Sequence, residues 1–350
     1  MDDFRLIVSD TRDPYVNLAT EEYLLRQTAG YWLYLWRNDP AVIVGVNQNA
    51  VEEVNFDYTA ANGIKIVRRL TGGGAVYHDP GNVCYTIIAP YDPAADHYRV
   101  FTAPVVAYLN GLGVAAAFSG RNDITVDGYK ISGNAETVWH DRILHHGTVL
   151  FDTDMTALGA ALRPNKLKME SRGIKSVRAR VTNVKDRLPV PMTADAFFAG
   201  LVAFFEKGRE RYDFSPADKA AVEALVREKY AAFAWNVGRS PKGSNLFEAA
   251  FPFGVFSLHF DTEKGLIRNA TVHGDFFSLR DVKELAAHLE GVPFERQAVE
   301  RALSVVGDYI KGATAGERKS LPHPIFPVRA VVAHFKDQEL EGLVEWLECA

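Results

Sequence analysis

The stretch from Arg68 to Gly81 reads RRLTGGGAVYHDPG, with two arginines ahead of three consecutive glycines and a short apolar run. Glycine has no side chain to pack and loses much backbone freedom on folding, so three in a row add no stability. They indicate a place where the main chain passes close to another group. Bare backbone N–H groups can approach a phosphate or carboxylate closely, and the arginines could add a charged fork. The alternative is a glycine hinge with its arginines in solvent.

Two familiar nucleotide motifs do not fit these glycines. A P-loop requires Gly-Lys-Ser/Thr after its glycines, whereas Gly74 is followed by Ala75 and Val76. A dinucleotide fingerprint requires G-x-G-x-x-G at the start of a helix, but its third position is Tyr77 and the segment alternates like a strand. The pattern that remains is strand, arginines, glycines, strand.

Composition limits the classes of protein to consider. The 350 residues suffice for two domains, and 47% hydrophobic with 24% charged residues is ordinary for a soluble globular protein. A net charge of −5 argues against a nucleic-acid binder. No apolar run is long enough to cross a membrane, and the start lacks the features of a secretory signal. The two cysteines lie far apart, which fits a reducing compartment. We therefore expect a cytoplasmic protein, a monomer without membrane or nucleic-acid partners.

Hydrophobic spacing predicts strands and helices in a mixed order. Asn17 is the expected N-cap of a helix that runs to about Gln27. Residues 75–78 and 83–88 are expected to form a hairpin around a DPGN turn, and a helix near 98–112 is expected to kink or end at Pro104. Residues 142–151 are expected to form a strand. GRSPKGS near residue 240 has linker composition, so we place a domain boundary there, between 1–240 and 241–350.

Asp127-Gly128 is a strong signal for a two-residue hairpin turn. In that register Thr125 faces Lys130 and Asp123 faces Ser132, while Ile124, Val126, Tyr129 and Ile131 share an apolar face. Lys130 would then stand on the polar face with a carboxylate diagonally across from it. Either it is a solvated strand residue, or it is an ordered cation aimed at a negatively charged group.

Three further features of the sequence bear on its chemistry. Nine Lys or Arg residues between Arg163 and Arg187 are opposed only by Glu170 and Asp186, which indicates either a solvated basic loop or a loop that meets phosphates or an acidic partner. His145 and His146 are neighbours on one strand and face opposite ways, so a structural metal is rejected. Cys84 is expected to be a small core residue rather than a nucleophile.

Seven stretches of the sequence occur in the order typical of one family: IVSDTRDPYVNLATEEYLLR (7–26), LWRNDPAVIVGVNQN (35–49), the arginine–glycine stretch, SGRNDITVDGYKISGNA (119–135), HHGTVLFD (145–152), GIKSVRARVTNV (173–184) and LHFDTEKGLI (258–267). Together they resemble the lipoate–protein ligases of the lipoate–protein ligase A type. The resemblance implies an α+β (α/β) fold. Its catalytic domain would be like those of biotin–protein ligases and class II aminoacyl-tRNA synthetases, with a mixed antiparallel sheet and flanking helices. A small α/β accessory domain would follow.

The same resemblance implies ATP-dependent activation of lipoate to lipoyl-AMP with Mg²⁺, in a catalytic lipoate- and ATP-binding domain over 1–240. Transfer would follow to a lysine of the lipoyl domains of 2-oxoacid dehydrogenase E2 subunits or of the glycine-cleavage H protein. Lys130 would be the catalytic residue. The implied adenylate-binding residues are Arg69, Gly74, Ala75, Val76, Tyr77, Asn122, Asp123, Lys130, Val177, Thr182 and Asn183, with Asp123 also a candidate for Mg²⁺. The implied lipoate-binding residues are Leu18, Trp36, Arg69, Gly72, Gly73, Gly74, His78, Lys130, His146 and Gly147.

Two other functions remain open at this point. One is an ATP-independent octanoyl or lipoyl transferase, for which Cys84 would be the acyl acceptor. The other is a non-catalytic protein that binds a lipoyl-type cofactor and tolerates the loss of Lys130. The sequence does not separate lipoate from octanoate as the acid.

Overall fold

The structure is a computed structural model, and it describes residues 4–120, 122–163, 181–238, 245–251, 254–263, 266–275, 282–293, 298–299 and 301–302. The chain divides into two compact units, Met1–Ser240 and Pro241–Ala350. Each unit is described by itself below. Val177 and most of the basic cluster lie outside the described residues. No described helix has both the length and the apolar composition that a membrane crossing requires.

A seven-stranded sheet forms the centre of the first unit, in the order β1-β2-β6-β10-β9-β8-β7. Only β1 and β2 are parallel, so the sheet is mixed and mainly antiparallel, as expected. The strands are β1 Arg5–Val8, β2 Trp32–Arg37, β6 Asn82–Pro90, β7 Ala117–Ser119, β8 Asp123–Val126, β9 Tyr129–Trp139 and β10 Arg142–Leu150.

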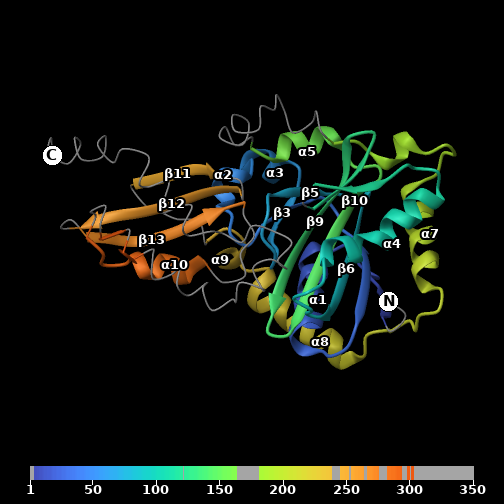
Figure 1. The fold of residues 1–350 in the computed structure, drawn as a ribbon, viewed down its shortest axis with the longest axis horizontal. Helices are drawn as coiled ribbons and strands as arrows, with labels where there is room; N and C mark the ends of the chain where they lie inside the picture. The colour runs from blue at the N-terminus through green and yellow to red at the C-terminus, as the bar shows by residue number, and fades with distance from the viewer. Residues whose placement is uncertain are drawn as a thin grey trace. The chain divides into compact units, whose positions relative to one another are not determined.

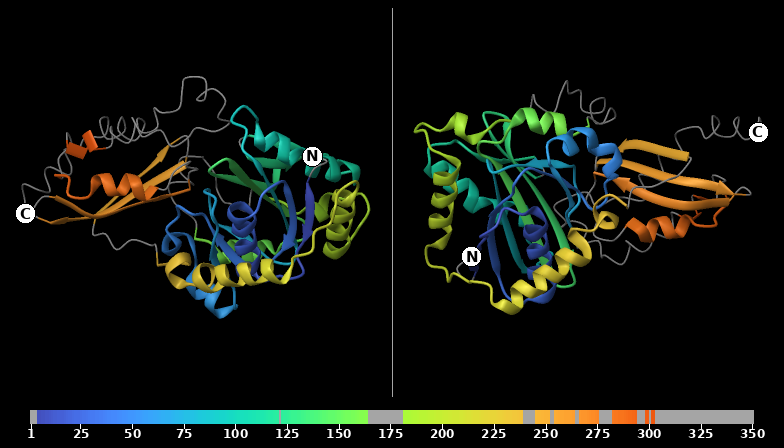
Figure 2. Two further views of the ribbon diagram at one scale, coloured as in Figure 1. Left: turned by 90° about the horizontal axis from the view of Figure 1, so that it is seen from below. Right: turned by 180° about the vertical axis from the view of Figure 1, so that it is seen from behind.

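Helices cover both faces of this sheet (Figures 1 and 2). Alternate residues of β2 go to opposite faces, so Tyr34 and Trp36 pack with α1 and α8, while Leu33 and Leu35 pack with α4 and α7. We call these the α1 face and the α4 face. The helices of this unit are α1 Pro14–Gln27, α2 Ala50–Glu53, α3 Phe56–Ala61, α4 His97–Gly111, α5 Met155–Ala161, α7 Ala194–Glu206, α8 Pro216–Leu225 and α9 Phe233–Asn236, with a 3₁₀ turn at Val184–Arg187 and a π-helix at Val226–Tyr230.

The predicted N-cap of the first helix was wrong, and one of the two alternatives at Pro104 is excluded. The N-cap of α1 is Asp13, whose side chain accepts from the Tyr15 amide, and Pro14 takes the first helical position. Asn17 instead lies inside the helix and is fully buried. Pro104 does not end α4, which continues through it to Gly111.

The glycine stretch joins two strands of one small sheet. Strand β5 (Val76–His78) pairs with β3 (Ala41–Val44), which also pairs in parallel with β4 (Lys65–Arg68) in a separate three-stranded sheet. The predicted hairpin between 75–78 and 83–88 is therefore wrong, because β6 belongs to the seven-stranded sheet. The chain leaves the small sheet at β4, passes through the glycines and re-enters it at β5.

A bulge modifies the predicted hairpin at Asp127-Gly128. Val126 faces Tyr129 and Thr125 faces Lys130 as predicted, but Ile124 then faces Ser132. Ile131 is the extra residue on β9, so Asp123 faces Gly133 and not Ser132. The bulge reverses the alternation of β9 and brings Lys130 and Gly133 to the same face. Tyr129, at the turn, is 41% exposed and does not join the buried apolar residues.

The second unit contains a three-stranded antiparallel sheet in the order β11-β12-β13. The elements described in it are β11 Asn245–Phe251, β12 Gly254–Glu263, β13 Leu266–Gly274 and α10 Val282–Leu289.

Candidate active site

Arg68 fixes the loop that follows β3. It is fully buried, and one of its guanidinium nitrogens donates to the carbonyls of Gly45, Val46 and Gln48 at 2.6–3.3 Å. The other nitrogens donate to the carbonyls of α9 at Trp235 and Asn236. Arg68 therefore fixes loop 45–48 by binding the carbonyl oxygens of that loop.

Arg69 does the same for the glycine loop. It donates to the carbonyls of Gly72 (2.6 Å), Gly74 (2.9 Å) and Ile43 (3.1 Å), and to Thr71 Oγ1 (2.9 Å). Burial lowers the pKa of Arg69 to about 10. Neither arginine lies in solvent. Both bind main-chain oxygens.

The two loops pack closely at glycines. A methyl group on Gly45 would lie 2.1 Å from the carbonyl oxygen of Gly73, so no side chain fits there. Gly73 has a φ of +89°, which favours glycine. The carbonyl oxygens of Gly72 and Gly74 point toward Arg69, and the N–H groups of the loop do not bind this side chain. In the part of the chain that the structure describes, the amides of Gly72, Gly73 and Gly74 have no hydrogen-bond acceptor. Consecutive free amides of this kind bind anions.

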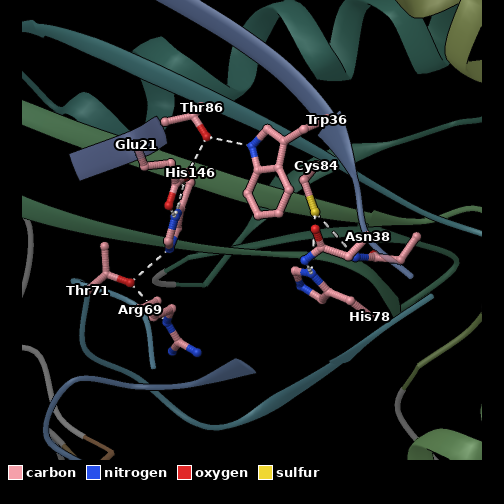
Figure 3. Close-up of polar contacts among 10 residues, drawn as sticks. Glu21, Trp36, Asn38, Arg69, Thr71, His78, Cys84, Thr86 and His146 are labelled. Atoms are coloured by element: carbon pink, nitrogen blue, oxygen red, sulfur yellow. Dashed lines mark hydrogen bonds and ion pairs between the residues drawn. The ribbon is translucent and has the colours of Figure 1, made fainter. Parts of the chain in front are cut away.

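A buried polar network attaches the glycine loop to the α1 face (Figure 3). Thr71 Oγ1 lies 2.8 Å from Nε2 of His146, and Nδ1 of the same ring lies 2.9 Å from the Glu21 carboxylate. Glu21 also accepts from Thr86 Oγ1 (2.5 Å), which in turn accepts from Nε1 of Trp36 (2.9 Å). The network thus connects α1, β2, β6, β10 and the glycine loop.

Lys130, on β9, is connected to this network through strand β10. Its ammonium is 2.7 Å from Asp123 Oδ1, and both side chains are about one-third exposed. A methyl group on Gly133 would lie 2.9 Å from Lys130 Nζ. Gly133 in turn contacts Thr148 Oγ1. His146 and Thr148 are two residues apart on the same face of β10, about 7 Å by strand geometry. Strand β10 therefore brings the glycine loop and Lys130 to one face of the sheet.

The other predicted residues fall into two groups. Leu18, Trp36 and Val76 pack on the α1 face with the network. Ala75 is half-buried and packs against a different cluster, the one that contains Tyr77. Tyr77 packs away from that face, in the cluster under α5. Gly147 faces Tyr85 on the α4 face, where a side chain would collide with Asn134, so the structure does not place it with His146.

The remaining predicted residues form hydrogen bonds within the protein. Asn122 exchanges hydrogen bonds with Asn134, and Asn183 does so with Thr153. The Thr182 amide donates to the carbonyl of Lys130 at 3.1 Å. Among the described residues, no group of three or more His, Cys, Asp or Glu side chains could hold a metal ion.

Sequence reasoning missed several residues of this site, namely Glu21, Asn38, Gly45, Thr71 and Gly133. Gly45 directly follows a buried strand, much as Gly72–Gly74 come shortly after β4. This position was a signal for a close approach of the main chain. Glu21 gave no such signal, because a glutamate within a helix usually faces solvent.

Comparisons with known proteins identify the family of this chain. Residues 13–206 match the family model "Lipoyl protein ligase A/B catalytic domain", and residues 240–320 match "Bacterial lipoate protein ligase C-terminus". Lipoate-protein ligase LplJ of Bacillus subtilis (strain 168) is 40% identical over 86% of this chain and 91% of that protein. Lipoate–protein ligase 1 of Staphylococcus aureus (strain Mu50) is 41% identical over 83% and 90%.

Solved structures give the same result. Plasmodium falciparum LipL1 in complex with lipoate aligns with a TM-score of 0.69 and 27% identity, over 86% of this chain and 94% of that one. A lipoate-protein ligase A bound with ATP aligns with a TM-score of 0.59 and 30% identity, over 67% and 99%. These neighbours confirm the predicted fold class. The fold, the site and both family matches lead to one conclusion: this chain belongs to the lipoate–protein ligase family.

Proposed function

We propose that this protein is an ATP-dependent lipoate–protein ligase that works through lipoyl-AMP. The lipoate carboxylate attacks the α-phosphorus of ATP, and pyrophosphate leaves. A lysine amine of an acceptor domain then attacks the acyl carbonyl, and AMP leaves. One observation supports this most. Strand β10 contacts both the glycine loop, whose amides have no acceptor among the described residues, and the residues that hold the Lys130 ammonium.

Adenylation must bring two anions together, so it needs fixed positive charge where their oxygens meet. The amides of Gly72–Gly74 can donate to the oxygens of one anion, because Arg69 binds the carbonyl oxygens of Gly72 and Gly74. Lys130 can neutralise the charge of the other anion. Its ammonium is fixed by the ion pair with Asp123 and lies in the space that the missing side chain of Gly133 leaves. Arg69 acts in this scheme as the support of the loop rather than as the phosphate ligand.

The remaining roles follow from position. Gly74, Ala75, Val76, Asn122 and Thr182 are the candidates to line the nucleotide, and Leu18, Trp36, His78 and His146 to line the acyl chain. Mg²⁺ binds proteins through one or two carboxylates together with substrate phosphates. Asp123 is the only one of our candidate residues that could serve it, so the ion would arrive with the nucleotide.

The acceptor is proposed to be a lipoyl domain of an E2 subunit or the glycine-cleavage H protein. An archaeal neighbour is described as a bi-partite lipoate protein ligase with its E2 lipoyl domain, at a TM-score of 0.60 and 30% identity. Residues 1–240 would carry both chemical steps, and residues 241–350 would form the accessory domain.

One assay tests the proposal. Purified protein is mixed with lipoate, ATP and Mg²⁺, and pyrophosphate release is measured with and without an added lipoyl domain. We expect lipoate-dependent pyrophosphate release, and a mass increase of the lipoyl domain equal to one lipoyl group. Lipoylation from a carrier thioester without ATP, and no pyrophosphate, would instead indicate the transferase.

A further inference from the structure

A straight row of residues crosses the α1 face of the sheet. Trp36 pairs with Cys84, Cys84 pairs with Thr148, and Thr148 contacts Gly133, where the Lys130 ammonium lies. These residues stand on four adjacent strands, so the row is about 14 Å long. A chain whose carboxylate lies at Lys130 and which follows the row has its far end at Trp36. The ring of His78 lies beside Trp36, with centroids 5.8 Å apart.

The buried side chains behind His78 have fixed hydrogen-bond directions. Asn17 Nδ2 lies 3.0 Å from the carbonyl of Arg37 and 2.9 Å from Asn38 Oδ1. A main-chain carbonyl can only accept, so this atom of Asn17 must be the amide nitrogen. Its oxygen correspondingly accepts from the hydroxyl of Tyr34 at 2.6 Å. The atom of Asn38 that faces Asn17 must therefore be its oxygen.

It follows that Asn38 presents its NH₂ group to His78. Asn38 Nδ2 lies 3.1 Å from His78 Nδ1, and the Cys84 sulfur lies 3.7 Å from the same nitrogen (Figure 3). Burial raises the pKa of Cys84 well above its usual value, so its thiol is also a donor. Burial, with help from Arg69 and His146, lowers the pKa of His78 to about 3. His78 is thus neutral, accepts at Nδ1 and carries its proton on Nε2.

The Nε2–H group of His78 has no partner. It is buried, and no hydrogen-bond acceptor for it exists among the residues that the structure describes. Buried donors are nearly always paired, with protein, water or ligand. A donor that is fixed in direction and left unpaired beside Trp36 is suited to an acceptor atom on a ligand.

We propose that His78 donates from Nε2 to a sulfur of the lipoate ring, and that this bond makes the site select lipoate over octanoate. The inference rests on the proposed function. Octanoate ends in a methyl group and would leave the donor buried and unpaired, whereas a sulfur is a weak acceptor. Sites built to hydrogen-bond one substrate discriminate against analogues that lack the partner. Asn17 and Asn38 are positioning residues, because they act only through His78.

The wild-type protein allows the first test. Long-range ¹H–¹⁵N spectra of ¹⁵N-labelled protein distinguish the two neutral forms of a histidine ring. We expect the Nε2–H form for His78 without ligand, and a change of the Nε2 shift with lipoate that octanoate does not produce. An Nδ1–H form, or equal changes with both acids, would overturn the inference.

Asn38→Asp gives the second test. One aspartate oxygen still accepts from Asn17. The other replaces the NH₂ group that faces His78 Nδ1, and as an acceptor it favours the form of His78 with its proton on Nδ1. We expect the KM for lipoate to rise about three- to tenfold, the range of one neutral hydrogen bond, and that for octanoate to rise by less than about twofold. Asn62→Asp, at an exposed helix end, is the matched control.

The two possible failures are distinguishable. If the wild type releases pyrophosphate with neither acid, the proposed function fails. If it activates both acids, and Asn38→Asp moves the His78 proton without changing the ratio of the two KM values, only the inference about His78 fails.

Discussion

The ammonium of Lys130 occupies the space that a side chain at Gly133 would fill. A methyl group there would lie 2.9 Å from Nζ and 3.0 Å from Cε. The bulge at Ile131 creates this relationship, because regular alternation would send residues 130 and 133 to opposite faces. Gly133 thus determines where the charge of Lys130 lies.

Gly133→Ala should therefore displace the ammonium without unfolding the protein, because the tip of a lysine moves easily. We expect kcat for pyrophosphate release to fall about tenfold or more, since small misplacements of a catalytic group are costly. The melting temperature should hardly change. Gly111→Ala, at the end of α4 with open space around it, is the control and should keep full activity. An unchanged kcat for Gly133→Ala would contradict this role.

Glu21→Gln tests the buried network. Glutamine has no charge, and its NH₂ group replaces one of the two oxygens that face His146 Nδ1 at 2.9 and 3.2 Å, so the link through His146 to Thr71 weakens. We expect the free energy of unfolding to fall by about 1.5–3 kcal/mol, the worth of a hydrogen bond to a charged group. Urea unfolding measures it, with the exposed Glu206→Gln as control. A loss below about 0.5 kcal/mol, typical of surface changes, would show that the network is not needed.

A second buried pair predicts a dependence of stability on pH. On the α4 face, His145 Nδ1 lies 2.7 Å from Glu136, among Tyr85, Tyr98 and Phe101. Burial raises the pKa of Glu136 from 4.5 to about 8. It also lowers the pKa of His145 to about 3, so this ring is neutral near pH 7.

Between pH 4.5 and about 8 the folded protein keeps a proton on Glu136 that the unfolded chain has released. Glu136 therefore makes the free energy of unfolding fall as the pH rises through this range. Glu136→Gln should remove that slope and make the variant relatively more stable at pH 8 than at pH 5. Thermal unfolding across this range measures the effect. Parallel pH profiles of wild type and variant would refute the assignment.

Cys84→Ser separates the ligase from the thioester transferase. Cys84 is buried, and its raised pKa makes it a poor nucleophile. We expect the variant's rate of lipoate-dependent pyrophosphate release to change by less than about twofold. Complete loss of acyl transfer in Cys84→Ser, with the fold intact, would support the transferase instead.

Local signals predicted the parts of the structure that local chemistry determines. Asp127-Gly128 gave the turn, and the alternation after it gave the contact of Lys130 with Asp123. The bulge at Ile131 was not predictable, because it depends on packing against the rest of the sheet. The hairpin expected for 75–88 failed because β5 finds its partner in β3, over 30 residues earlier.

The candidate site shows the same division. The glycines and Lys130 stood out because their residue types are unusual in strands. Glu21 did not, because its partner His146 is 125 residues away in the chain. The arginines stood out as well, but the sequence does not reveal that Arg68 and Arg69 are buried against main-chain carbonyls.

The central claim is that the fixed charge of Lys130 makes adenylation possible. Lys130→Ala should lower the rate of lipoate-dependent pyrophosphate release by about 10²–10³, as for other preorganised donors. Lys65→Ala is the matched control, because Lys65 forms a similar ion pair with Asp13 at 2.9 Å and similar exposure; it should keep the wild-type rate. If Lys130→Ala lowers the rate by less than about threefold, the charge is not needed and the account is wrong.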